Sequence, residues 1–247
     1  MSLTTYRADL HIHSLLSPCG DLEMSPANIV AEACRKGLNI IGITDHNTTR
    51  QALLIKQLGE KQGLFVLCGA EVTTREEAHC LSFMPDEASL EIFQHYLDAH
   101  LPDIKNDSEQ FGFQVCVDKN EQIIYEEERL LISALDQSLE QVEQKVHELG
   151  GIFIPAHINR PRFSLISQLG FVPTDLPVDA LELSKHTTIE AFKAANAYLA
   201  DYAFIQNSDA HFVNDIGTVF NLLTLSHRSF EEVRKALRNL QQKNVQK

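Results

Sequence analysis

The stretch Arg7-Ala8-Asp9-Leu10-His11-Ile12-His13 predicts the first strand of the fold, because apolar and polar residues alternate along its second half. After a polar loop, Ser25-Pro26 is a favoured start for a helix that we expect to run to about Lys36 and to end at Gly37. Residues 39–43 form the next short apolar strand. A strand, a helix and a second strand in this order predict a β/α unit with parallel strands.

The same alternation of short apolar runs and amphipathic stretches continues along most of the chain. We expect further strands at 64–67, 78–83, 152–155, 179–183, 202–206 and 218–225, and helices at 49–62, 88–100, 126–149, 188–200 and 229–241. Residues 114–117 and 122–125 resemble a hairpin. These patterns predict an α/β fold with a mainly parallel sheet in a single domain over 1–247, with residues 84–150 as an insertion within it.

Composition narrows the classes of partner. The 247 residues carry 21 Lys+Arg against 34 Asp+Glu, a formal net charge of −13. An acidic chain is a poor binder of long nucleic acid, so we expect no such partner. No apolar run approaches the roughly 20 residues of a membrane-spanning helix, and we expect no membrane association. Five cysteines without a disulfide framework, and no leader segment, predict a cytoplasmic protein.

Histidines and carboxylates gather where the predicted strands end. Asp9, His11 and His13 share one face of the first strand, where two imidazoles about 7 Å apart along the chain can reach one ion. Similar side chains lie at or near the ends of later strands: Asp45, His46, Glu71, His79, His157, Asp209 and His211. A single histidine in such a place is usually structural, but a set of this size predicts a metal centre on one rim of a barrel. His95, His100, His147 and His227 fall in or beside helical patterns, where we expect packing or solvated roles.

Three motifs resemble those of the PHP (polymerase and histidinol phosphatase) superfamily: Asp9-Leu10-His11-Ile12-His13-Ser14, Thr44-Asp45-His46-Asn47 and Ser208-Asp209-Ala210-His211. With Glu71, His79 and Pro155-Ala156-His157 the resemblance covers residues 7–217, although 84–150 carry no motif. It implies a distorted (β/α)7 barrel, similar to a TIM barrel, that binds two or three divalent ions. Phosphate-ester hydrolysis is the commonest activity that it implies.

The resemblance also implies roles for the ligands. His11, His13, Glu71 and Asp209 would hold one ion, and Glu71 would bridge to a second ion held by His79 and His157. His46 and His211 would belong to a third site. Its remaining ligand in histidinol-phosphatase-like members is a histidine at the position of Cys19.

Cys19 leaves that third site with open alternatives. A thiolate suits zinc or iron better than manganese, so Cys19 is one candidate ligand. A free thiol without a ligand role is the other, with Asp21 or Glu23 taking its place at the metal. The sequence does not choose among zinc, iron and manganese.

A centre of this kind predicts hydrolysis by a hydroxide that bridges two ions, with Glu71 and Asp209 as its carboxylate ligands. Asp45 or His186 is the candidate acid for the leaving group, and Asp9 is expected to orient an imidazole. Cationic side chains beyond the ligands are candidates for binding a phosphate, with solvated surface charge as the alternative. They are Arg160 and Arg162, with Lys185, His186 and Arg50 as weaker candidates.

Three functions of different classes follow from these features. The leading one is a metal-dependent phosphoesterase acting on a small phosphate monoester, such as a phosphorylated metabolite or a nucleotide. The second is an amidohydrolase-type enzyme that uses the same centre on a carbonyl, against which Arg160 and Arg162 argue mildly. The third is a noncatalytic metal-binding PHP module, against which the intact ligand set argues.

Overall fold

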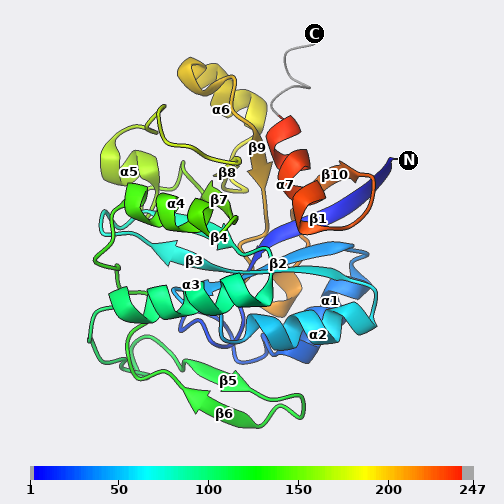
Figure 1. The fold of residues 1–247 in the computed structure, drawn as a ribbon, viewed down its shortest axis with the longest axis vertical. Coiled ribbons are helices and arrows are strands. Elements are labelled where there is room, and N and C mark those ends of the chain that lie inside the picture. Colours follow the sequence, from blue (N-terminus) through cyan, green and yellow to red (C-terminus); the bar gives the residue numbers. More distant parts are fainter. Residues whose placement is uncertain (1–2, 241–247) are drawn as a thin grey trace.

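A computed structural model describes residues 3–240 and shows a curled, mixed β-sheet with helices packed on its outside (Figure 1). The sheet has the order β10-β1-β2-β3-β4-β7. Its strands are β1 (Thr4–Ile12), β2 (Ile40–His46), β3 (Phe65–Thr73), β4 (His79–Phe83), β7 (Ile152–Pro155) and β10 (Asn221–Leu225). The α/β class and the first β/α units are therefore as the sequence predicts.

The sheet is curled because one pair of strands links its two sides. β8 (Leu181–Leu183) pairs in parallel with β9 (Phe204–Gln206). The amide of Asp179 donates to the carbonyl of Phe153, which ties this pair to β7. On the other side, beyond the part of β1 that pairs with β10, a parallel bridge joins Ile12 of β1 to Ala210, which follows β9. The ends of β1, β2, β3, β7 and β9 are thereby brought to one rim.

The expectation of a mainly parallel sheet is wrong. β1 pairs in parallel with β2, and β2 with β3, but β4 is antiparallel to both of its neighbours and β10 is antiparallel to β1. The reversal at β4 follows from the short polar turn between Thr73 and His79, which leaves no room for a crossover helix. It places the first residue of β4, His79, on the rim where β3 ends.

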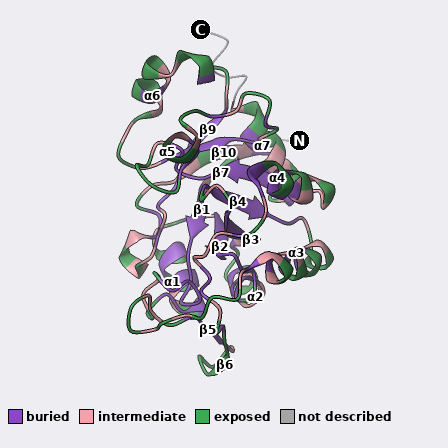
Figure 2. Cartoon of the chain, turned by 90° about the vertical axis from the view of Figure 1, so that its left-hand side faces the viewer, coloured by how far each residue is buried: buried purple, intermediate pink, exposed green. Residues whose placement is uncertain are grey.

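Seven α-helices of the described residues 3–240 cover the strands. They are α1 (Pro26–Arg35), α2 (Ala52–Lys61), α3 (Glu87–His100), α4 (Leu139–Glu148), α5 (Leu165–Leu169), α6 (Ile189–Ala195) and α7 (Phe230–Asn239). Side chains such as Ile29 of α1, Ile55 of α2 and Phe93 of α3 belong to one apolar cluster with Ile41 and Ile43 of the sheet. A second cluster lies beneath Val233 and Leu237 of α7. Figure 2 shows the strands buried between these layers.

The predicted helix over residues 126–149 is wrong in its first half, since α4 begins only at Leu139. Ser138 and Gln141 form a capping box that starts the helix there. Upstream, the buried side chain of Gln114 donates to the carbonyls of Glu127 and Arg129 and accepts from the amide of Leu131. These hydrogen bonds satisfy the backbone in an irregular conformation and replace helical ones.

Other boundaries differ by smaller amounts. The predicted hairpin is present as β5 (Val115–Val117) and β6 (Ile123–Glu126), the helix over 188–200 ends at Ala195, and the last strand begins at Asn221. The last helix reaches Asn239, while its expected end at Gln241 lies outside the described residues. No helix within residues 3–240 is both long and apolar enough to cross a membrane. A single domain over 1–247 stays a prediction.

Candidate metal centre

Glu71, at the end of β3, is the hub of a buried cluster of imidazoles. Its Oε1 lies 2.9 Å from Nδ1 of His79 and 2.9 Å from Nε2 of His157. Its Oε2 faces three further ring nitrogens, Nε2 of His13 at 3.2 Å, Nδ1 of His46 at 3.3 Å and Nε2 of His11 at 3.4 Å. One carboxylate thus faces five histidines, which come from β1 and the loop after it, from β2, from β4 and from the loop after β7.

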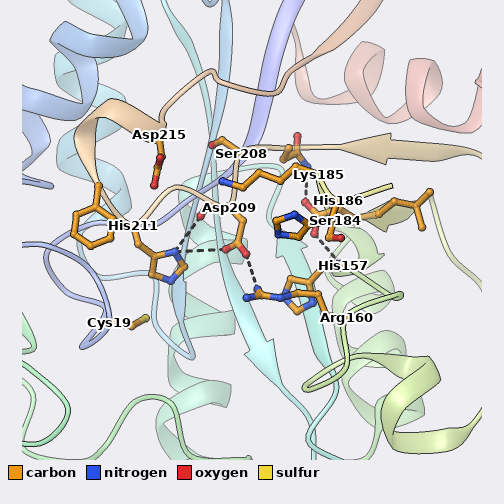
Figure 3. Close-up of a pocket in the computed structure, with 14 residues that line it drawn as sticks. Cys19, His157, Arg160, Ser184, Lys185, His186, Ser208, Asp209, His211 and Asp215 are labelled. Carbon is orange, nitrogen blue, oxygen red and sulfur yellow. Dashed lines mark hydrogen bonds and ion pairs between the residues drawn. The ribbon is translucent and has the colours of Figure 1, made fainter. Parts of the chain in front are cut away.

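Asp209 and His211 complete the cluster from the loop after β9. The Oδ1 atom of Asp209 lies 3.4 Å from Nε2 of His11 and 3.6 Å from Nε2 of His13. The ring of His211 stacks on that of His13, with centroids 4.2 Å apart. Figure 3 shows Asp209 between His211 and Arg160, whose Nη1 donates to Oδ2 of Asp209 at 2.6 Å. All eight histidine and carboxylate ligands implied by the resemblance therefore converge.

The backbone is held in unusual conformations at this rim. His157 and Asp209 have φ values of +28° and +52°, in the region that disfavours residues with a Cβ. Asn47, next to His46, has φ +49°, and its side chain donates to the carbonyls of Leu131 and Ser133. Asn47 thereby ties a loop of the 84–150 segment to the strand that carries His46. Such strain persists where surrounding contacts enforce it, as at many functional sites.

Two carboxylates behind the cluster fix the orientation of its imidazoles. Glu182 of β8 lies 3.1 Å from Nδ1 of His11 through each of its oxygens. Ser17 accepts from Nδ1 of His13 at 3.0 Å and donates to Asp45 at 2.7 Å. In both rings the Nδ1 proton is used, so the lone pair of Nε2 points into the cluster.

Asp9 and Asp45 make other contacts than those expected of them. Asp9 touches no imidazole through its carboxylate, which instead accepts from Ser208 and from the amide of Gly217, so the orienting carboxylate for His11 is Glu182. Asp45 accepts from the amide and hydroxyl of Ser14 and from Ser17, so both of its oxygens are taken. Asp45 is thus placed to orient a ligand, and its role as the acid for the leaving group stays a prediction.

Sequence reasoning missed Glu182. Its signal was present, since an acidic residue stands between two leucines in the apolar strand Leu181–Leu183. A carboxylate buried in such a strand needs partners, and Glu182 has them in His11, Asn207 and the amide of His157. Only the pairing of β8 with its neighbours reveals which ligands it serves.

The donor set fits divalent metal ions. Nε2 of His11 and Nε2 of His13 lie 3.1 Å apart. With both Nδ1 atoms donating to Glu182 and Ser17, these two nitrogens are close enough to bind one shared cation. Nδ1 of His46 is buried and has no hydrogen-bond partner within residues 3–240. Three groups of converging ligand atoms occur there: His13, His46 and His211; His11, His13 and Glu71; and His46, Glu71 and His79.

Electrostatics of the cluster show how strongly its charges interact. Burial favours the neutral form of Glu71, yet the imidazoles of His79 and His11 outweigh it and hold its pKa well below the usual range. Burial lowers the pKa of His46 far below its ordinary value, and burial with the neighbouring His13 lowers that of His211 to about 4. His46 and His211 are thereby held in the neutral form that binds a metal ion, whereas the carboxylates of Glu182 and Glu71 outweigh burial at His11 and raise its pKa.

Cys19 lies at the entrance of the centre. Two cavities open onto the cluster, and Cys19 lines both of them. In Figure 3 it lies on the same side of Asp209 as His211. Desolvation of the thiol and the carboxylate of Glu71 raise its pKa to about 12. None of the three converging groups contains Cys19, so its role as a ligand stays a prediction.

The cationic candidates separate into near and remote residues. Arg160, Lys185 and His186 line one cavity of about 360 Å³, and Arg160 and Arg162 line a second of about 370 Å³. Arg50 is remote from both, because it pairs with Asp98 at 2.7 Å and its guanidinium lies over the ring of Tyr125. Arg50 lines neither cavity, and a phosphate-binding role for it stays a prediction.

The family comparison agrees with this geometry, because residues 9–244 match the PHP domain. The chain belongs to the PHP domain family. The uncharacterized protein YqxK of Bacillus subtilis is 28% identical to this PHP chain over 96% of its length. The match spans 63% of YqxK, so the chain covers less than two thirds of that relative.

Solved structures share the PHP fold. The lesion-specific endonuclease Q of Pyrococcus furiosus superposes with a TM-score of 0.73 at 22% identity, over 96% of this chain and 56% of the endonuclease. A proposed metal-dependent phosphoesterase from Bifidobacterium adolescentis gives 0.66 at 19% identity, over 93% of this chain and 95% of that protein. These matches confirm the PHP type of α/β fold that the motifs predict.

Proposed function

We propose that this PHP chain is a metal-dependent hydrolase that cleaves phosphate esters. The observation that carries the proposal is the single carboxylate of Glu71 facing five imidazoles, beside a guanidinium fixed on Asp209. Phosphoesterase names among PHP-fold structures support it.

The ligands divide among two or three ions as the family resemblance implies. His11, His13, Glu71 and Asp209 would hold one ion, and His79 and His157 would hold a second with Glu71. His46 and His211, whose ring nitrogens converge with that of His13, would hold a third. Ions bound there supply a water nucleophile at neutral pH and offset the charge of the phosphate; zinc, iron and manganese are the candidates.

The chain's own groups bind and orient the ester. Arg160 is 45% exposed and uses Nη1 for Asp209, so the rest of its guanidinium faces the cavity and can hold a phosphate oxygen. Glu182 and Ser17 keep the lone pairs of His11 and His13 directed at the centre. His186, in the cavity beside Arg160, stays the candidate acid for the leaving group.

Two substrate classes fit this activity. A small phosphate monoester is the one that the sequence predicts. A phosphodiester is the second, because endonuclease Q has been solved with a 27-mer duplex that carries an abasic lesion at its active site. The net charge of −13 argues against long nucleic acid, but it describes the whole chain and not the cationic side chains gathered at this rim. If the same centre acted on a carbonyl compound, these cationic side chains would have no phosphate to bind.

The proposal is tested by elemental analysis of the purified chain and by phosphate release from a panel of monoesters and diesters with added manganese or zinc. We expect bound metal, and hydrolysis that falls at least a hundredfold in Asp209→Asn and His11→Ala. Asp201→Asn, an exposed carboxylate outside both cavities, is the matched control and should keep wild-type activity. A metal-loaded chain that cleaves no ester in the panel contradicts the proposal.

A further inference from the structure

The two cavities at the rim meet at the metal ligands. Both are lined by His157, Asp209, His211 and Arg160, and they have similar volumes of about 360 and 370 Å³. The first continues over Ser184, Lys185, His186 and Phe212, and the second over Ile132, Pro161, Arg162 and Phe163. Figure 3 shows the first cavity, with Lys185 and His186 beside Asp209. A group held at the shared ligands can therefore extend into both spaces.

Each cavity also presents an exposed aromatic ring. Phe163 in the second cavity is 43% exposed and Phe212 in the first is 55% exposed. The ring of Phe163 is stacked on that of His79, with centroids 5.0 Å apart and an interplanar angle of 13°, which covers one of its faces. Isolated exposed aromatics are common on protein surfaces, but one in each cavity beside a catalytic centre is a specific arrangement.

The position of Phe163 is enforced by the fold. Its backbone has φ +55°, a conformation that disfavours residues with large side chains. The carbonyl of Phe163 accepts from the amide of His79 at 3.1 Å, which holds this conformation beside a metal ligand. The ring is thus presented by a fixed backbone, and such preorganisation lowers the entropic cost of binding a ligand.

Unpaired cations accompany the two rings. Arg162 lies next to Phe163, and Lys185 lines the cavity of Phe212. Within residues 3–240, neither side chain makes an ion pair or a hydrogen bond. A ring to stack on and a free cation on each side match the chemistry of a nucleotide chain, whose planar bases alternate with phosphates.

We propose that Phe163 and Phe212 are stacking residues that hold one ring-bearing group on each side of the scissile phosphate. The substrate is then a phosphodiester between two nucleosides of an unpaired strand. Water adds to phosphorus, one P–O ester bond breaks, and the leaving alkoxide takes a proton, so the products are one phosphate monoester and one alcohol. This inference rests on the proposed function and specifies its substrate.

A monoester leads to a different expectation for the two rings. Its single organic group fills one cavity, so only one of the two phenylalanines contributes to binding. With a dinucleotide both rings are covered, and each should contribute separately. The number of aromatic residues that affect affinity therefore distinguishes the two substrate classes.

Binding tests this without any turnover. Fluorescence anisotropy is measured with the whole metal-loaded chain and a labelled single-stranded phosphorothioate oligothymidylate of six nucleotides, whose backbone resists hydrolysis. Stacking on one aromatic residue accounts for about a five- to hundredfold change in affinity. Phe163→Ala and Phe212→Ala should therefore each raise the dissociation constant by that factor. Phe163→Trp should restore it and Phe163→Leu should not.

Phe171→Ala is the matched control, since Phe171 is 55% exposed and lines neither cavity. It should bind like the wild type. If both cavity variants bind the oligonucleotide as tightly as Phe171→Ala, or if only one of them loses affinity, the two-sided site is overturned.

Activity separates this inference from the proposed function. With manganese, Phe163→Ala and Phe212→Ala should each lower kcat/KM for a dinucleotide by at least fivefold more than for glycerol phosphate, which carries no ring. A wild type that cleaves glycerol phosphate but no dinucleotide overturns the inference and leaves the phosphoesterase proposal standing. A wild type that cleaves neither overturns the proposed function, while the binding measurement still decides whether the rings stack.

Discussion

Glu182 holds His11 through Nδ1, with both carboxylate oxygens 3.1 Å from that nitrogen. The same carboxylate accepts from the side chain of Asn207 and from the amide of His157. It therefore links two implied ligands of different ions, one through its ring and the other through its backbone. Both residues are buried, so this contact is not weakened by solvent.

We expect Glu182→Gln to weaken metal binding by about ten- to a hundredfold, the usual effect of removing a group that orients a ligand. Both oxygens of the Glu182 carboxylate accept hydrogen bonds. In glutamine an NH2 group replaces one of these oxygens, and it would face a donor from His11, Asn207 or His157. Metal content after dialysis and competition with a chelator measure the effect. Glu190→Gln, an exposed change on α6, is the control, and equal metal affinity of the two variants contradicts the role.

The convergence of histidines and carboxylates was predictable from sequence because short motifs at strand ends carry them. His11 and His13 need only the period of a strand to share a face, and Asp209 and His211 lie two residues apart in one loop. Glu182 and Ser17 were not predictable in the same way. Their roles depend on which strand lies beside which, and that is a property of pairing rather than of local pattern.

The fold shows the same division. Capping residues such as Ser25 and Ser229 locate helix starts correctly, since each accepts from an amide in the first turn. The irregular path before Leu139 was missed, because its backbone partners come from the side chain of Gln114, in a distant segment. The reversal of β4 was missed because an apolar run fits either direction of pairing.

Ser17→Ala should lower metal affinity by up to about tenfold and unfolding free energy by about 1 kcal/mol. The change removes the acceptor for Nδ1 of His13 and one donor to Asp45. Chelator competition and urea unfolding report the two effects. Ser82→Ala is the matched control, because Ser82 is equally buried and its hydroxyl has no partner within residues 3–240. Similar losses in both variants would falsify the orienting role of Ser17.

Gly42→Ala should destabilise the chain by about 2 kcal/mol, within the range for overpacking a tight site. A Cβ at position 42 would lie 2.6 Å from the carbonyl oxygen of Leu10, so β1 and β2 must separate. These strands carry His11 and His46, and metal content should fall as well. Urea unfolding and elemental analysis test this.

Gly63→Ala serves as the comparison for that substitution. Gly63 has φ +78° and no atom within 4 Å of an added Cβ, so its alanine variant suffers only backbone strain, about 1 kcal/mol. It should keep full metal content. A Gly42→Ala protein with wild-type metal content and stability shows that the close approach of β1 and β2 is not required.

His147 and Asp179 should make stability depend on pH at a place remote from the metal centre. Hydrogen bonding to Asp179 raises the pKa of His147, with Glu143 adding to it against partial burial. Burial favours the neutral form of Asp179, but the hydrogen bond from His147 and the amide of Phe153 outweigh it and lower the pKa of Asp179. Arg238 also pairs with this carboxylate, at 2.5 Å.

The two shifts define a pH window for this stabilisation. A raised pKa in the folded state means that the contribution of His147 is complete below its unfolded value of about 6.5 and is lost as the pH rises through the folded value. A lowered pKa means that the contribution of Asp179 is complete above about pH 3.9 and is lost as the pH falls further.

His147→Gln should therefore reduce the unfolding free energy most between about pH 4 and 6.5, by on the order of 1 kcal/mol because the imidazole is partly exposed. Its cost relative to wild type should shrink above that range, whereas His95→Gln, on the exposed face of α3, should show no such dependence in urea unfolding. A cost that grows from pH 6 to 9 would mean that the neutral imidazole, and not its ion pair with Asp179, stabilises the fold.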